Sequence, residues 1–300
     1  MIDLTEESLS LIFYTCVIIG NFGIVTNMLN IFVSMKSEIM KIKTGFYFIL
    51  ISIFNILTII FTLYLLLFPQ SIGRPDLATT SFLACWLIPY LLRVVSQMVS
   101  WLNVVLTYDR MLCTTITYHI HFMYDNQKVK HLLLVMFVII CVLNLPNFFF
   151  HIEANTCTPN WNFITVLRDS VSMLNRIIVP QTLQTVFNVI LIVRLFKKRE
   201  EIDRPLEKER RFAFTVVISN IVFIVGEMPF LIATVFINMY GYNTTYITTT
   251  SIQAAVASFA FLCATAFLAL VGYSSSLFVN IFTNKTYRNE VKKILGLNVR

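Results

Sequence analysis

The sequence predicts an all-α membrane protein whose seven transmembrane helices form one bundle. Of its 300 residues, 57% are hydrophobic and 13% are charged, whereas soluble domains carry about 25% charged residues. Seven stretches are apolar and long enough to cross the roughly 30 Å hydrocarbon core of a bilayer as helices. We therefore expect a single transmembrane domain over residues 1–300, with spans at about 9–35, 45–68, 82–113, 130–150, 171–196, 211–238 and 248–282.

The distribution of basic residues predicts how this bundle is oriented. Most of the 23 Lys and Arg residues lie at the ends of the odd-numbered spans or just after them. The exceptions are Arg74, Arg93, Arg168 and Arg176. Because cytoplasmic loops carry an excess of basic residues, the N-terminus is expected outside and the C-terminus in the cytoplasm. The net charge of +7 is then explained by basic residues that lie beside anionic lipid, and it does not indicate binding to nucleic acid.

The two ends of the chain fit this orientation. No Lys or Arg precedes Lys36, so the first span lacks the basic flank of a cleaved signal peptide and is expected to be retained. After the last span, residues 285–297 place apolar residues at helical spacing between basic ones. We expect a short amphipathic helix that lies on the inner membrane surface.

The third span, 82–113, is expected to occupy the centre of the bundle. From Cys85 to Arg110 a helix would rise about 37 Å, enough to reach both aqueous faces. Its polar residues recur at steps of one, three or four and therefore share one side. They are Arg93, Ser96, Gln97, Ser100, Asn103, Thr107 and Arg110. Since unsatisfied polar groups are costly in lipid, this side must face other helices.

Amide side chains predict contacts between the first two spans. Asn27 lies in the middle of the first span with Asn30 one turn later, and Asn55 is the strongly polar residue at the centre of the second. Buried amides either tie helices together or line a site. We expect a tie, with Asn55 as the partner of Asn27.

Two cysteines are expected to share the outer, oxidising compartment. Cys85 begins the third span at its outer end, and Cys157 lies in the outer loop after the fourth. The other four lie within spans or at a cytoplasmic end: Cys16, Cys113, Cys141 and Cys263. A disulfide between Cys85 and Cys157 is therefore predicted, and two free thiols are the alternative.

The inner end of the third span carries an acid and a base side by side, Asp109 and Arg110. Glu209, at the cytoplasmic start of the sixth span, is placed to pair with Arg110 and hold the two helix ends together. The alternative is that Arg110 extends to water and Glu209 is one solvated charge in a mixed run.

The order and spacing of these residues resemble those of rhodopsin-like G-protein-coupled receptors. The resemblance extends over nearly the whole chain and is carried by Cys85, Asp109-Arg110, Cys157, Pro180, Glu209, Phe223 and Pro229. The segments GIVTNMLNIF and FTNKTYRNEVKKIL look like invertebrate neuropeptide receptors of the FMRFamide type. The resemblance implies a multi-pass receptor of the plasma membrane that binds an extracellular peptide and activates a heterotrimeric G protein.

Several positions depart from the family pattern. Asn55 stands where the family carries Asp in the second span, and Met111 replaces the Tyr that follows Asp-Arg. The Cys-Trp-x-Pro motif of the sixth span becomes Gly226-Glu227-Met228-Pro229, and the Asn-Pro-x-x-Tyr motif of the seventh falls on residues 276–280. The residues expected to act in switching are Asp109, Arg110, Glu209, Phe223 and Pro229. The expected interhelical polar residues are Asn27, Asn55, Ser276 and Asn280.

The resemblance also implies a ligand cavity in the outer half of the bundle. Leu92 occupies the position where amine receptors carry Asp, which argues against a monoamine ligand. The residues expected in the pocket are Leu92, Arg93, Ser96, Gln97, Arg176 and Glu227. Two bases against one acid favour a ligand with an anionic group, whereas an amidated peptide would use Glu227 for a basic side chain. The structural alternative is that the arginines extend outwards and Glu227 is protonated or hydrogen-bonded to a neighbouring helix.

Other functional classes find less support. The sequence has no HExxH motif, Gly-rich phosphate loop or intramembrane Asp pair, so we expect neither an enzyme nor a metal or cofactor site. Light sensing would need a Schiff-base Lys, and residues 248–282 contain none. A transporter or channel is the alternative, because Arg93, Arg176 and Glu227 are intramembrane charges; the absence of repeated halves argues against it. Asn243, in the last outer loop, begins a glycosylation sequon.

Overall fold

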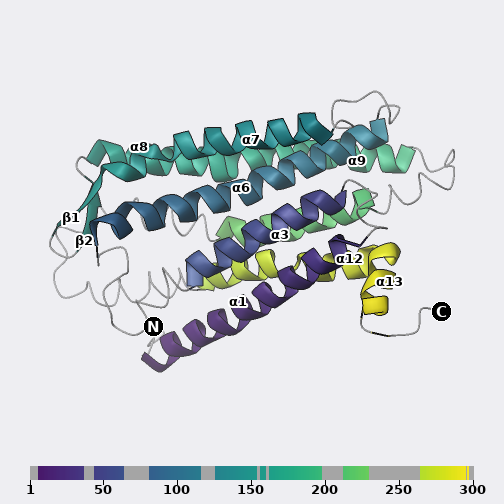
Figure 1. Ribbon diagram of the computed structural model, residues 1–300, viewed down its shortest axis with the longest axis horizontal. Coiled ribbons are helices and arrows are strands. Elements are labelled where there is room, and N and C mark those ends of the chain that lie inside the picture. The colour runs from purple at the N-terminus through teal and green to yellow at the C-terminus, as the bar shows by residue number, and fades with distance from the viewer. Residues whose placement is uncertain are drawn as a thin grey trace, which may run out of the picture.

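The computed structural model describes residues 6–36, 44–63, 81–115, 126–153, 156–159, 162–197, 212–229, 264–294 and 296. These residues are nearly all helical, and the long helices run side by side (Figure 1). Within the described ranges, six helices are long and apolar enough to cross a membrane, and a seventh span is counted if one bent pair is taken as one. The predicted all-α membrane bundle is confirmed in this form.

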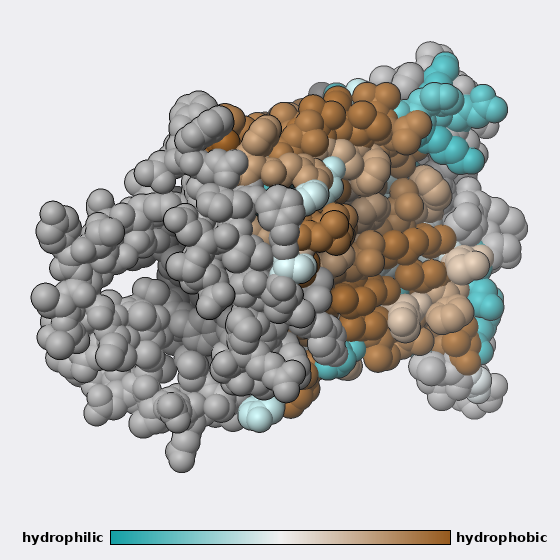
Figure 2. Space-filling view, turned by 60° about the vertical axis from the view of Figure 1, so that its left-hand side comes forward, coloured by the Kyte–Doolittle hydropathy of each residue, from teal (hydrophilic) through white to brown (hydrophobic). Residues whose placement is uncertain are grey.

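The surface of the bundle agrees with a membrane setting. Figure 2 shows a broad hydrophobic band over the helices, with hydrophilic residues gathered at one end. On α1 (Glu6–Ser34), large apolar side chains such as Ile18 and Phe32 are 69% and 63% exposed. Lipid tails are as apolar as these side chains, so burying them gives little driving force, and helix association depends on close packing and polar contacts.

Close packing begins between α1 and α3 (Thr44–Ile60), which continues as a wide turn to residue 63. A side chain at Gly20 would collide with Leu63, and one at Gly23 would collide with Ser274. Small residues at such positions let helices approach closely enough for their backbones to interact. Glycine therefore fixes the distance of α1 from two neighbours.

The helix α6 (Phe82–Thr115) lies at the centre of the described bundle. It contacts α3, the helix α7 (Asn126–Leu143) and the fifth span. Its polar side is buried as the spacing predicts, with Ser96, Gln97 and Thr107 each at 0% exposure. The third span is thus confirmed as the protein-enclosed helix.

A short β-hairpin is the departure from the all-α prediction. After α7 comes a 3-10 helix, η3 (Leu145–Phe149), and then strands β1 (Phe150–Glu153) and β2 (Thr156–Pro159), which pair antiparallel. Cys157 lies opposite Ile152 in this pairing. Because β1 packs against α6, the hairpin lies at the same end of the bundle as the start of that helix (Figure 1).

The fifth span begins earlier than predicted. The helix α8 (Asn162–Met173) precedes a π-helical turn, η4 (Leu174–Ile178), and α9 (Val179–Lys197) follows. The sequence predicts a start at residue 171, whereas the helix already contains Arg168 and Asp169, whose charges are paired with each other. Pro180 cannot donate a backbone hydrogen bond one turn back, and a widened turn beside a proline is a common result.

The last described spans are the helical segment Phe212–Pro229 and the pair Ala264–Ser274 and α12 (Ser276–Thr283), bent by 46°. A Cβ at Gly226 would lie 2.8 Å from the Leu268 carbonyl oxygen and 3.2 Å from the Cα of Gly272. The two segments thus meet backbone to backbone, which explains why Gly stands here in place of a larger residue.

The surface helix is present and shorter than predicted. α13 (Lys285–Ile294) turns away from the direction of the long helices (Figure 1), whereas the sequence predicts residues 285–297. Its basic residues Lys285, Arg288 and Lys292 are exposed and Tyr287 is buried. This division of faces is the one expected of a helix on a membrane surface.

Candidate functional site

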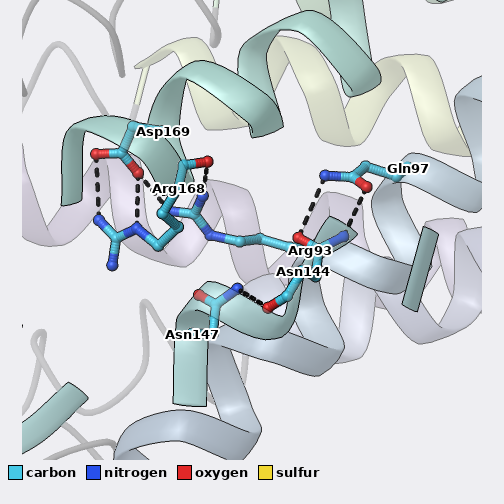
Figure 3. Close-up of polar contacts among 6 residues, drawn as sticks. All are labelled: Arg93, Gln97, Asn144, Asn147, Arg168 and Asp169. Carbon is cyan, nitrogen blue, oxygen red and sulfur yellow. Dashed lines mark hydrogen bonds and ion pairs between the residues drawn. The ribbon is translucent and has the colours of Figure 1, made fainter. Parts of the chain in front are cut away.

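Three charged residues from α6 and α8 meet in one cluster (Figure 3). Arg93 Nη2 donates to Asp169 Oδ1 at 2.9 Å, and Arg168 donates to both oxygens of the same carboxylate, through Nε at 2.8 Å and Nη2 at 3.2 Å. Their side chains are between 15% and 20% exposed. The charged groups are thus mutually compensated and partly exposed.

A cluster of amides lies one turn further along α6. Gln97 Oε1 accepts hydrogen bonds from Asn144 and Asn175, each at 2.7 Å. Trp101 donates to the side chain of Asn175 at 3.0 Å, and Asn147 donates to the Asn144 carbonyl at 2.8 Å. Gln97 is completely buried, so in a membrane these bonds replace water as its partners and join α6 to α7 and to η4.

A buried ion pair connects three spans. Arg176, in η4, donates to Glu227 Oε2 at 2.9 Å and to the hydroxyl of Tyr273 at 3.2 Å. The side chain of Arg176 is 16% exposed and that of Glu227 is 3% exposed. Removing charges from water is costly, and a close partner with further hydrogen bonds offsets that cost. Glu227 is therefore the counter-ion of Arg176 in this structure.

Tyr273 joins this ion pair to a second polar group. Its carbonyl oxygen accepts from Asn27 at 3.0 Å and from Asn55 at 3.3 Å. Asn55 also donates to Asn27 Oδ1 at 3.2 Å, the contact that the sequence predicts. Ser276 reaches the same Asn27 oxygen at 3.5 Å. Tyr273 thus contacts the Arg176–Glu227 pair through its hydroxyl. Its backbone carbonyl contacts the group formed by Asn27 and Asn55.

A third group ties α13 to the bundle. Asn280 donates to Asn30 Oδ1 at 3.2 Å, Asn30 donates to Ser52 at 2.7 Å, and the Tyr287 hydroxyl donates to Asn30. Tyr287 is completely buried, and this burial raises the pKa of its hydroxyl. The phenol therefore stays protonated and remains a donor at physiological pH.

Towards the C-terminal end of α6, its polar side contacts the sixth span. Asn220 donates to Thr107 Oγ1 at 2.6 Å and to Asn188 Oδ1 at 3.2 Å. In addition, Gln184 donates to the Ser100 carbonyl at 3.0 Å. These bonds link α6, α9 and the segment Phe212–Pro229 without charged groups.

The acid and base at the end of α6 pair with each other. Arg110 donates to Asp109 Oδ2 through Nε at 3.0 Å and through Nη2 at 2.5 Å. The side chains are 2% and 1% exposed. Arg110 is thus buried and does not extend to water, contrary to the alternative prediction. Glu209, its expected second partner, lies outside the described residues, as does Asn243.

Cys85 is disulfide-bonded and 1% exposed. Cys16, Cys113 and Cys141 are present as thiols. Cys157 belongs to β2, and β1 packs against α6. This proximity supports the predicted pairing of Cys85 with Cys157, which stays a prediction because the structure does not describe the Cys157 side chain.

The remaining predicted residues fall near these clusters. Phe223 is 6% exposed, and its ring meets that of Tyr273 edge to face with centroids 5.9 Å apart. Pro229 is the last described residue of its helix, and Leu92 is half-buried beside Arg93. Ser96 is buried and donates to the Arg93 carbonyl within its own helix at 3.1 Å.

Sequence reasoning missed several partners that the structure supplies, above all Asp169, Asn144, Asn175 and Tyr273. Asp169 had a usable signal, since it directly follows an arginine at the edge of an apolar stretch. Nothing in the sequence distinguishes Tyr273 from the other 11 of the chain's 12 tyrosines.

The described residues contain no group of three or more His, Cys, Asp or Glu side chains that could hold a metal ion. No protein-family model matches the chain, and comparison with curated proteins yields no significant match.

Proposed function

We propose that this chain is a G-protein-coupled receptor of the rhodopsin-like kind. In this proposal seven spans cross the plasma membrane, with the N-terminus outside and the bent pair Ala264–Ser274 and α12 as the seventh. An extracellular ligand, a peptide, binds in the outer half. A heterotrimeric G protein is activated at the cytoplasmic face, towards which the basic residues lie.

The observation that carries the proposal is the buried pair of Asp109 and Arg110 at the inner end of α6. An arginine near the edge of a membrane would ordinarily extend to water, which avoids the cost of burial. Arg110 instead remains inside the bundle at 2% exposure. A charge retained at such cost at the cytoplasmic end supports a role in recognition or switching there.

A second support is the division of polar groups along the bundle. The predicted outer half contains ion-paired residues. Four of them have side chains that are 15–20% exposed, namely Arg93, Arg168, Asp169 and Arg176, whereas Glu227 is 3% exposed. Amides and hydroxyls dominate the middle and the region of α13. Charged groups accessible from outside suit ligand binding, while buried amides suit helix contacts that can rearrange between two states.

The position of Leu92 bears on the ligand class. A cationic amine would need a carboxylate facing the cavity, and Leu92 offers none. Glu227 is 3% exposed and bound to Arg176, so a basic ligand group would first have to displace that arginine. A peptide that carries an acidic group is the better match to the described charges.

A transporter is the second candidate, because ion pairs inside spans also mark substrate paths. The π-helical turn η4 and the 46° bend before α12 are interruptions of the kind that transporters place at substrate sites. The two interruptions lie in the predicted fifth and seventh spans, which do not occupy corresponding positions in two halves. This asymmetry favours the receptor.

The test is a cell-surface activation assay with a promiscuous G protein and a library of neuropeptides. A receptor should give a ligand-dependent response that Arg110→Ala abolishes at matched surface expression. Arg288→Gln, which removes an exposed charge from α13, is the matched control and should leave the response unchanged. Ligand-independent flux of solutes across vesicles, with no G-protein response to any peptide, would identify a transporter instead.

A further inference from the structure

Three arginines lie in the predicted outer half, and the structure distinguishes them by how far each is neutralised. Arg176 has Glu227 as its own counter-ion and the Tyr273 hydroxyl as a further acceptor. An incoming anion at Arg176 would approach the Glu227 carboxylate, whose negative charge would repel it in a site of low polarity. Arg176 is therefore poorly suited to hold an anionic ligand group.

Arg93 is held in a different way. Its Nη2 donates to Asp169 Oδ1, the oxygen that also accepts from Arg168 Nε. Its other hydrogen bond is a long one, 3.5 Å from Nη1 to the Arg168 carbonyl. A guanidinium carries five N–H donors, and described residues accept hydrogen bonds from two of its three nitrogens, Nη1 and Nη2. Because its side chain is 20% exposed, the group is not completely enclosed by the protein.

Neighbouring charges favour an additional anion at this position. The positive charges of Arg168 and Arg176 both act on Arg93, and the negative charge of Asp169 offsets them in part. Asp169 is itself divided between Arg93 and Arg168 (Figure 3). A second carboxylate beside Arg93 would reduce the repulsion among the guanidinium groups.

We propose that Arg93 is the anchor for a carboxylate of the extracellular ligand. A planar guanidinium binds a carboxylate through two parallel hydrogen bonds, which gives both affinity and orientation. In this arrangement Asp169 orients Arg93 from the other side and competes with the ligand for its charge. The inference rests on the proposed receptor function and adds the chemical class of the ligand group and the residue that binds it.

The competing explanation is that Arg93 and Asp169 only tie α6 to α8. The two explanations differ in the sign of one effect. If the pair were only a tie, loss of either partner would destabilise the protein and neither would improve anion binding. If Arg93 is an anchor, Arg93→Gln removes the anion site. Asp169→Asn instead removes a competing anion and strengthens the binding of the ligand carboxylate to Arg93.

The experiment measures thermal unfolding of the purified full-length protein in detergent. The probe is N-acetylphenylalanine as the free acid, with its amide as the matched uncharged compound, at constant ionic strength. The acid should raise the unfolding temperature and the amide should not. For Arg93→Gln the half-maximal acid concentration should rise at least about tenfold, the loss expected of a charge-assisted pair, and for Asp169→Asn it should fall.

Two controls make the outcome decisive. Arg93→Lys keeps the charge and loses the bidentate geometry, so it should retain an intermediate response, and Arg288→Gln should behave as the wild type. Equal responses to acid and amide, or an unchanged response in Arg93→Gln, would overturn the proposal. Since the assay needs no G protein, an intact acid response in a chain that fails to activate G proteins would reject the receptor function alone.

Discussion

Asn27 of α1 donates a hydrogen bond to the carbonyl oxygen of Tyr273 at 3.0 Å, although 246 residues separate them in the sequence. The hydroxyl of the same tyrosine accepts from Arg176 in η4. Tyr273 therefore joins the Arg176–Glu227 pair to the group of Asn27 and Asn55, through its hydroxyl and its backbone carbonyl. A displacement of the Tyr273 ring would directly affect the backbone carbonyl to which Asn27 donates.

The first prediction concerns Asn27. Asn27→Ala removes hydrogen bonds to two carbonyls and an acceptor used by Asn55 and Ser276. Individual hydrogen bonds within membranes average about 0.6 kcal/mol, so the loss should be about 1–3 kcal/mol. Thermal unfolding of the purified protein measures it. The control is Asn21→Ala, which removes an exposed amide of the same helix; similar losses in both variants would contradict the proposed importance of the buried amide.

The second prediction concerns the ion pair of Arg176 and Glu227. Glu227→Gln leaves a guanidinium without its counter-ion and should lower stability by on the order of 3 kcal/mol. The double variant Arg176→Met with Glu227→Leu removes both charges and should recover most of that loss. Thermal unfolding of the three proteins checks the order. A double variant no more stable than the single one would show that the pair contributes by more than mutual neutralisation.

The third prediction concerns the disulfide. Cys85→Ala should lower the free energy of unfolding by about 2–4 kcal/mol and should reduce surface expression sharply. If Cys157 is the partner, Cys157→Ala should have the same effect, and the double variant should be no worse than either. Mass spectrometry of non-reduced peptides identifies the bond directly. Cys141→Ala, which removes a thiol, is the control and should leave expression unchanged.

The fourth prediction concerns Glu209, which precedes the sixth span in the sequence. If Glu209 pairs with Arg110 in the resting state only, Glu209→Ala should raise basal signalling because it removes a contact that one state alone contains. Glu207→Ala removes a charge two residues away and serves as the control. Basal G-protein activity is measured at matched surface expression. An unchanged level in Glu209→Ala would indicate that this side chain is simply solvated.

Regular features of the fold were predictable because they repeat. The polar side of α6 follows helical spacing, and lipid excludes it, so its burial in the bundle followed from the sequence. The contact of Asn27 with Asn55 followed because each amide needed a partner at a similar depth. Both inferences used the cost of a polar group in lipid.

Features that depend on tertiary contact were not predictable. The pairing of Asp169 with Arg93 and Arg168 depends on how α6 meets α8, which no sequence pattern reveals. The role of Tyr273 depends on which helices meet near it, and one tyrosine has no periodicity to reveal that. The bend before α12 and the turn η4 likewise arise from packing and a nearby proline rather than from any repeated pattern.

The backbone contact at Gly226 has a mechanical consequence. From this contact, the described part of the helix extends back to Phe212. Gly226 lies 14 helical steps from Phe212, which corresponds to about 21 Å along the axis. Pivoting by about 10° around Gly226 would carry the far end through about 4 Å. A small rotation beside Glu227 is thereby magnified at the Phe212 end of the described helix.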